Sequence, residues 1–198
     1  MFFPTQEVEV IDTWNVGGLR GTGSHDYQVA SLFVPETHAI TGLTPSRLGT
    51  LYALPLYTVF PVTIGAVPLG IARAALDAVR ALSASKTARI GAVLLRDKPS
   101  VQGAVGRAEG MLRAARAFLF ETCDDVWKTA ASGAELSLEQ RAAVRLSGAQ
   151  VAEAGKAVVQ IAYDIGGGTS VYESCPLQRC LRDMNIVPLL DSLASIPF

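Results

Sequence analysis

Apolar residues recur at helical spacing through most of the chain. Between residues 101 and 126 they step by four and three positions without a break, which is typical of the seam of an antiparallel bundle or coiled coil. That seam consists of Val101, Val105, Ala108, Leu112, Ala115, Leu119, Thr122 and Val126. The pattern predicts a long helix here.

Three further helices follow from local signals. The first is expected to begin near Leu54 or Pro61 and to run to about residue 84. The next opens at Ser137, where Ser-Leu-Glu-Gln is a capping box, carries an apolar stripe and ends at the glycines 166–168. The last begins at Pro176, a residue type that suits the first helical position.

Strand-like alternation is confined to residues 7–11 and 27–34. Two or three strands are barely stable alone, so they belong to a larger β-domain or pair with another chain. The predicted fold is therefore mainly α: a four-helix up-and-down bundle at residues 45–198, preceded by the remnant of a β-domain at residues 1–40.

An uncharged stretch lies between Arg47 and Arg73 and is long enough to span a membrane. Its prolines and the absence of a flanking positive cluster favour instead a helix buried in an oligomer. The long second helix also carries Phe118, Phe120 and Trp127 outside its seam. This surplus of apolar surface predicts a homo-oligomer and no membrane.

Composition excludes other classes. Charged residues make up 18% of the chain and the net charge is −1, so there is no basic surface for nucleic acid. Cys123, Cys175 and Cys180 show no spacing of a disulfide framework or metal site, which favours a cytoplasmic protein with no metal. The start of the chain lacks the basic and apolar regions of a signal peptide.

Several local motifs leave alternatives open. The glycines at 166–168 permit backbone N–H groups to face a phosphate, or they simply end a helix. Ser24, His25 and Asp26 are adjacent on a strand and so do not form a catalytic triad. Arg179 and Asp183 are four residues apart, and we expect them to pair on one helix face.

Two phrases carry a family resemblance. Residues 18–36 read Gly-Leu-Arg-Gly-Thr-Gly-Ser-His-Asp-Tyr-Gln-Val-Ala-Ser-Leu-Phe-Val-Pro-Glu, and residues 166–183 read Gly-Gly-Gly-Thr-Ser-Val-Tyr-Glu-Ser-Cys-Pro-Leu-Gln-Arg-Cys-Leu-Arg-Asp. In this order they resemble the acyl-CoA dehydrogenase superfamily, most closely its flavin-dependent monooxygenase branch. The resemblance covers nearly the whole chain but only the C-terminal half of such an enzyme.

The resemblance implies a cofactor, partners and contacts. The cofactor would be FAD or FMN, reduced by a separate flavin reductase, and the substrate would be aromatic or polyketide-like. The assembly would be a homotetramer or dimer, in which the glycine loop touches a flavin held mainly by a neighbouring subunit. The implied flavin contacts are Gly166, Gly167, Gly168, Thr169, Gln102 and, by a looser match, Arg89; Trp14, Arg20 and Ser24 would lie on the substrate and flavin side, unless that turn merely packs Trp14.

The chain departs from the family near its end. Leu190 stands where the monooxygenases have a His near the flavin, and Asn185 replaces an earlier His. Asp191 stands where the dehydrogenases have their catalytic Glu and is the candidate base. Two alternatives therefore remain: an acyl-CoA dehydrogenase acting on an acyl thioester, favoured by Asp191, and a non-catalytic oligomerisation module from a decayed or truncated enzyme, favoured by Leu190 and the missing half.

Overall fold

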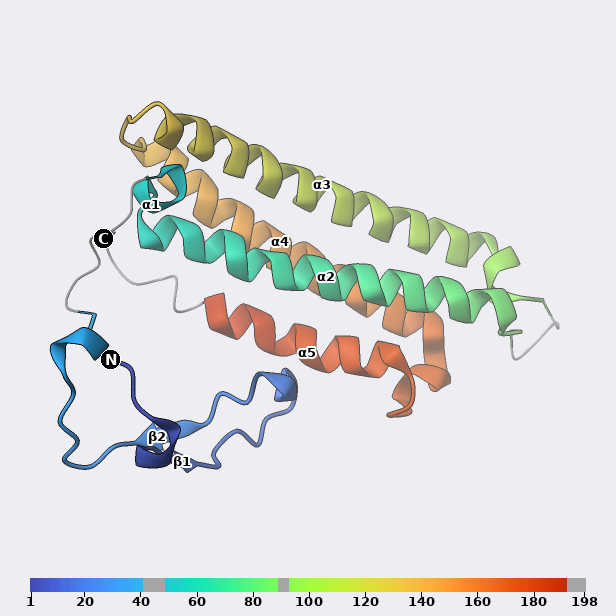
Figure 1. The fold of residues 1–198 in the computed structure, drawn as a ribbon. Helices are drawn as coiled ribbons and strands as arrows, with labels where there is room; N and C mark the ends of the chain where they lie inside the picture. Colours follow the sequence, from blue (N-terminus) through green and yellow to red (C-terminus); the bar gives the residue numbers. More distant parts are fainter. Residues whose placement is uncertain (41–48, 89–92, 192–198) are drawn as a thin grey trace.

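The computed structural model describes residues 1–40, 49–88 and 93–191, with side chains described as far as Val187. Four long helices lie alongside one another as a bundle, and a small β fragment lies beside α5 (Figure 1). The bundle helices are α2 (Leu56–Ser85), α3 (Pro99–Ala131), α4 (Leu138–Gly166) and α5 (Pro176–Asp191), preceded by the single turn α1 (Thr50–Ala53). The predicted four-helix bundle is confirmed, while the predicted domain boundary falls at residues 41–48, outside the described residues.

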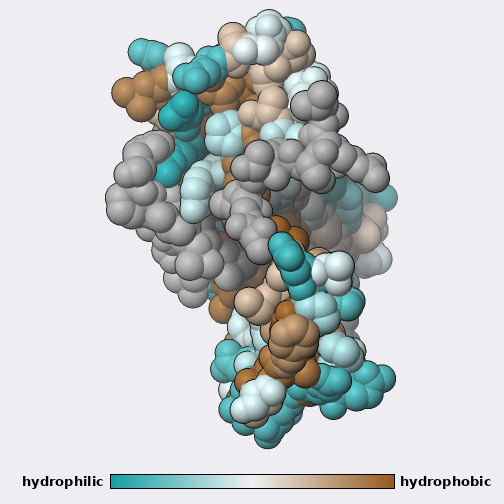
Figure 2. Space-filling view, turned by 60° about the vertical axis from the view of Figure 1, so that its left-hand side comes forward, coloured by the Kyte–Doolittle hydropathy of each residue, from teal (hydrophilic) through white to brown (hydrophobic). Residues whose placement is uncertain are grey.

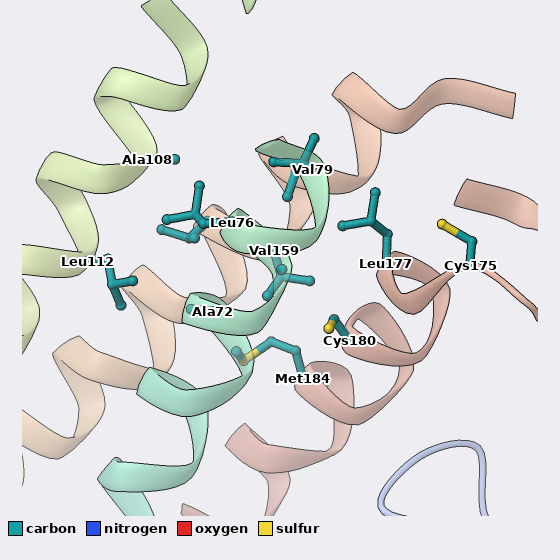
Figure 3. Close-up of a cluster of buried hydrophobic side chains, with 13 residues drawn as sticks. Ala72, Leu76, Val79, Ala108, Leu112, Val159, Cys175, Leu177, Cys180 and Met184 are labelled. Atoms are coloured by element: carbon teal, nitrogen blue, oxygen red, sulfur yellow. The ribbon is translucent and has the colours of Figure 1, made fainter. Parts of the chain in front are cut away.

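The seam predicted in α3 is the buried face of that helix. Its residues from Ala108 to Val126 are at most 6% exposed, whereas Val101 and Val105 are half-buried. The largest core cluster lies where α2, α3, α4 and α5 meet (Figure 3). Side chains from all four helices fill it: Ala72, Leu76, Val79, Ala108, Leu112, Val158, Val159, Leu177, Cys180 and Met184. Burial of these apolar side chains is the main force that holds the helices together.

Helix α2 runs without interruption through Pro61 and Pro68. A proline removes one hydrogen bond from a helix, and we had expected these prolines to oppose a regular span. On α4, Gly148 and Gly155 leave room for the two proline rings. A Cβ on Gly148 would lie 3.3 Å from Pro61, and one on Gly155 would lie 3.2 Å from Pro68. The two proline–glycine pairs bring the helices into close contact at two points one heptad apart.

The ends of α4 and α5 follow the local signals in the sequence. The Ser137 Oγ accepts a hydrogen bond from the Gln140 N–H, and the Gln140 side chain accepts one from the Ser137 N–H, so the capping box is present. Pro176 is the first residue of α5. These signals are local and therefore survive into the folded chain.

The β fragment is smaller than the alternation predicts. β1 (Glu9–Ile11) and β2 (Asp26–Gln28) form a two-stranded antiparallel sheet in which Val10 pairs with Tyr27. The prediction that the second strand extends to residue 34 is wrong, since Ser31 adopts a φ of 53° that breaks the extended backbone. Every residue of both strands is exposed, which fits a fragment that needs further partners.

Apolar side chains also reach the surface of the bundle. Hydrophobic residues lie among hydrophilic ones on the face shown in Figure 2, and Tyr57, Phe60 and Val67 of α2 are 44–55% exposed. Among the described helices, α2 alone is long and apolar enough to cross a membrane, and 33% of its apolar window is buried in this chain. The helix therefore has apolar surface that the single chain leaves uncovered.

Candidate functional site

The glycine loop lies where α4 ends. Gly166 is the last residue of α4, and residues 167–171 continue as a 3-10 turn (η5). Gly166 is buried so tightly that a Cβ there would lie 2.1 Å from the Ser170 Oγ and 2.7 Å from the Leu177 side chain. Gly167 has a φ of 52°, in the region that favours glycine. The glycines therefore end α4, which is one of the two roles considered from the sequence. The structure is also compatible with the other role, in which the loop contacts a phosphate.

Gly167 and Gly168 face open space. Both are exposed, and a Cβ built on either would meet no atom within 4 Å. Ser170 fixes the loop from behind, because its buried hydroxyl donates to the Tyr163 carbonyl at 2.8 Å. A ligand can therefore approach the backbone of two glycines held on a rigid support.

Lys86 binds the same loop and was not identified from the sequence. Its ammonium group donates to the Gly166 carbonyl at 2.7 Å and to the Thr169 Oγ1 at 2.6 Å. Lys86 follows the last residue of α2, eighty residues before the loop. A lone lysine after a helix has no local signature of such a contact.

The first turn of α3, which includes Gln102, lies at the same end of the bundle as the C-terminal end of α4 (Figure 1). The Gln102 amide donates to the Arg96 carbonyl at 2.9 Å. The adjoining cavity of about 440 Å³ is also lined by Arg80, Arg96 and Ser83, and the buried Ser83 hydroxyl has no hydrogen-bond partner among the described residues. The Ser83 hydroxyl and the guanidinium groups of Arg80 and Arg96 therefore offer hydrogen-bond donors to a polar ligand in this cavity. Arg89, the other residue expected here, lies outside the described residues.

A second group of expected site residues lies beside the middle of α5. The Trp14 indole N–H donates to the Leu19 carbonyl at 3.2 Å, and Arg20 Nε donates to the Val16 carbonyl at 2.8 Å. Ser24 Oγ donates to Thr22 Oγ1 at 3.2 Å. These contacts are all within the turn, while Arg20 also lines a cavity between the turn and α5, so the structure is compatible with both alternatives for this turn.

The turn is joined to α5 by its backbone. A Cβ on Gly18 would lie 2.3 Å from the Arg182 carbonyl oxygen, so only glycine fits here. The Leu19 N–H donates to Asp183 Oδ1 at 2.7 Å. The expected pairing of Arg179 with Asp183 is absent from the ion pairs of the described residues, and Asp183 instead accepts a backbone hydrogen bond from the β fragment. Between turn and helix lies a cavity of about 360 Å³.

The remaining chemistry is limited among the described residues. They contain no group of three or more His, Cys, Asp and Glu side chains arranged for a metal ion. The cysteines are free thiols, and burial raises the pKa of Cys180 and of Cys123, which disfavours their nucleophilic thiolate forms. His25 Nδ1 accepts from the Trp14 N–H at 3.3 Å, as a packing contact of the turn.

Asp191 is not brought to the glycine loop. It is the last residue of α5, whereas the loop precedes the first, and sixteen helical residues span about 24 Å. The side chains of Asp191 and Leu190 lie outside the described residues. The structure therefore gathers Gln102, Gly167, Gly168 and Thr169 at one end of the bundle and leaves Asp191 at the far end of α5.

Comparison with known proteins places this architecture. Residues 62–190 match the family described as Acyl-CoA dehydrogenase, C-terminal domain. The chain is 32% identical over 185 residues to the indole-3-acetate monooxygenase of Pseudomonas putida, covering 93% of the chain and 48% of that protein. It is 32% identical over 200 residues to the flavin-dependent monooxygenase oxygenase subunit HsaA of Rhodococcus jostii, covering 91% and 50%.

A solved structure shares the fold. XiaF from Streptomyces sp., in complex with FADH2 and glycerol, superposes with a TM-score of 0.82 at 24% identity, covering 93% of this chain and 49% of that one. The chain thus spans about half the length of the curated relatives it matches.

Proposed function

The chain belongs to the acyl-CoA dehydrogenase family, through its C-terminal domain, and from this premise we propose that it is the C-terminal part of a flavin-dependent monooxygenase. Two relatives at 32% identity over more than nine-tenths of the chain are monooxygenases. We propose an aromatic or polyketide-type substrate, in keeping with the indole ring named in one of them.

The single observation that carries the proposal is the open backbone of Gly167 and Gly168. The cofactor is a flavin, FAD or FMN, and the residues present fit one side of it. Among the described residues no side chain blocks the two glycines, and the Ser83 hydroxyl in the cavity beside Gln102 has no partner. Backbone N–H groups and hydroxyls suit the phosphates and sugar of a flavin nucleotide.

This chain's residues would bind and orient the flavin. Gly167 and Gly168 would contact the nucleotide closely, and Gln102 with Thr169 would add polar contacts at the same end of the bundle. When bound, the reduced flavin supplies the oxygen-activating chemistry. Leu177, which lies next to Gly166, belongs to the buried apolar core that α2, α3, α4 and α5 form.

The proposal includes two kinds of partner. A flavin reductase would supply the reduced cofactor, as the description of a relative as an oxygenase subunit suggests. A second copy of the chain would cover α3, where Phe120 and Trp127 are 53% and 46% exposed. We propose a homotetramer or dimer, and a reducing cytoplasmic setting that suits three free cysteines.

The test is flavin-dependent hydroxylation. Protein expressed from the complete coding region of this chain is incubated anaerobically with reduced FAD or reduced FMN and separated by gel filtration. We expect flavin to co-elute with the protein. On addition of oxygen and an indole or phenol, mass spectrometry should show a product that has gained one oxygen atom. Protein that retains neither flavin would refute the proposal.

A further inference from the structure

Lys86 fixes both ends of the exposed two-glycine segment. Its ammonium group donates to the Gly166 carbonyl on one side and to the Thr169 hydroxyl on the other. Gly167 and Gly168, between these acceptors, are exposed. Lys86 itself is half-buried, where a charge-assisted hydrogen bond is stronger than in water. A single side chain thus holds both ends of the two-glycine segment.

The charge of Lys86 matters as well as its hydrogen bonds. Gly166 ends α4, and the C-terminal end of a helix carries a partial negative charge. An anionic ligand that approaches Gly167 would meet that charge. The ammonium group on the Gly166 carbonyl offsets it. Lys86 therefore makes the end of a helix acceptable to an anion.

The backbone of Lys86 extends the connection toward Gln102. The Lys86 carbonyl accepts from the Leu95 N–H at 2.9 Å, and the carbonyl of the next residue, Arg96, accepts from the Gln102 side chain at 2.9 Å. The glycine loop and Gln102 are therefore linked through residues 86 and 95–96. The two proposed contact regions share one support.

We propose that Lys86 is a positioning residue of the proposed flavin contact: it holds residues 166–169 in the shape that presents Gly167 and Gly168, and its charge admits the anionic part of the nucleotide. The identity of the ligand rests on the proposed function. The role of Lys86 in holding the loop is independent of it, because it follows from the two hydrogen bonds.

The first experiment measures the loop without any flavin. Amide hydrogen exchange of peptides covering residues 166–171 is compared in wild type, Lys86→Met and Lys86→Arg. Lys156→Met, at an exposed lysine of α4, is the matched control. We expect roughly tenfold or faster exchange in Lys86→Met, a smaller change in Lys86→Arg and none in the control. Unchanged exchange in Lys86→Met would overturn the proposal.

A second variant guards against a misfolded protein. Thr169→Val removes one of the two acceptors and leaves the ammonium group on Gly166. If Lys86→Met does not fold, faster loop exchange in Thr169→Val supports the proposal and unchanged exchange overturns it.

The second experiment measures flavin affinity in protein from the complete coding region, by fluorescence titration with FAD and FMN. Lys86→Met should weaken binding about tenfold, equal to about 1.4 kcal/mol, while Lys86→Arg loses less and Lys156→Met nothing. Equal affinity in wild type and Lys86→Met overturns the positioning role. If the wild type binds no flavin, the proposed function fails, and the exchange experiment still decides whether Lys86 holds the loop.

Discussion

Replacing Glu109 with Gln should destabilise the contact between α2 and α3. Its carboxylate accepts hydrogen bonds from Arg73 at 2.6 Å and Arg80 at 2.9 Å, both on α2, and from Arg113 at 2.8 Å on its own helix. The hydrogen bond from Arg73, followed by that from Arg113, lowers the pKa of Glu109 from 4.5 to about 2. Only 16% of the Glu109 side chain is exposed. The folded state therefore stabilises the charged form of Glu109.

The magnitude follows from that lowering of the pKa. At about 1.4 kcal/mol for each pH unit it corresponds to roughly 3 kcal/mol as an upper bound. The guanidinium partners are 39–79% exposed, so solvent screening reduces the contribution. We expect Glu109→Gln to lower the free energy of unfolding by about 1–2 kcal/mol at pH 7.

The pH dependence gives the sharper test. Because the folded pKa lies below the unfolded one, the stabilisation is fully present above about pH 4.5 and is lost as the pH falls toward 2. The difference in the free energy of unfolding between wild type and Glu109→Gln should therefore become smaller below pH 4.5. Urea unfolding followed by circular dichroism at fixed protein concentration measures it, with Glu121→Gln as the control at an exposed glutamate of α3. An equal difference in the free energy of unfolding at pH 7 and pH 3 would refute this role of the Glu109 carboxylate.

Three further outcomes follow from the fold. Gly155→Val should lower the free energy of unfolding in urea by about 2 kcal/mol or more, because even a Cβ at this glycine would lie 3.0–3.3 Å from its neighbours. The control Gly110→Val, where a Cβ would meet no described atom within 4 Å, should lower it far less, and equal losses would contradict this prediction. Charged residues at Phe120 and Trp127 should lower the mass seen in light scattering, and a wild type that is already monomeric at micromolar concentration would exclude the oligomer. The 198-residue chain alone should not turn over any substrate, since the remaining half of the relatives' length is needed to close a water-excluding site; flavin-dependent product formation by this chain would disprove it.

The bundle could be predicted from the sequence because its signals are local. The buried seam of α3, the capping box at Ser137 and the proline that begins α5 each act within a few residues. The family resemblance also predicts flavin contacts at Gly167 and Gly168, and the structure shows that both glycines are exposed. Such local signals act in the same way regardless of distant parts of the chain.

The features that the sequence did not reveal depend on distant partners. Lys86 acquires its role from a carbonyl eighty residues away. Asp183 seemed available to Arg179 but is bound by the Leu19 N–H, a donor in the β fragment that no helical pattern includes. The fit of Pro61 onto Gly148 becomes visible only when α2 and α4 are placed side by side.

The bond between Leu19 and Asp183 has a consequence for biosynthesis. The two residues are 164 positions apart, and the donor is made near the beginning of the chain while the acceptor belongs to its last helix. At about 5–20 residues per second, a ribosome needs on the order of ten to thirty seconds to pass from one to the other. During that interval the turn at Gly18 and Leu19 has no α5 to pack against. Nascent chains halted before α5 should therefore expose this turn to proteases, and completion of α5 should protect it.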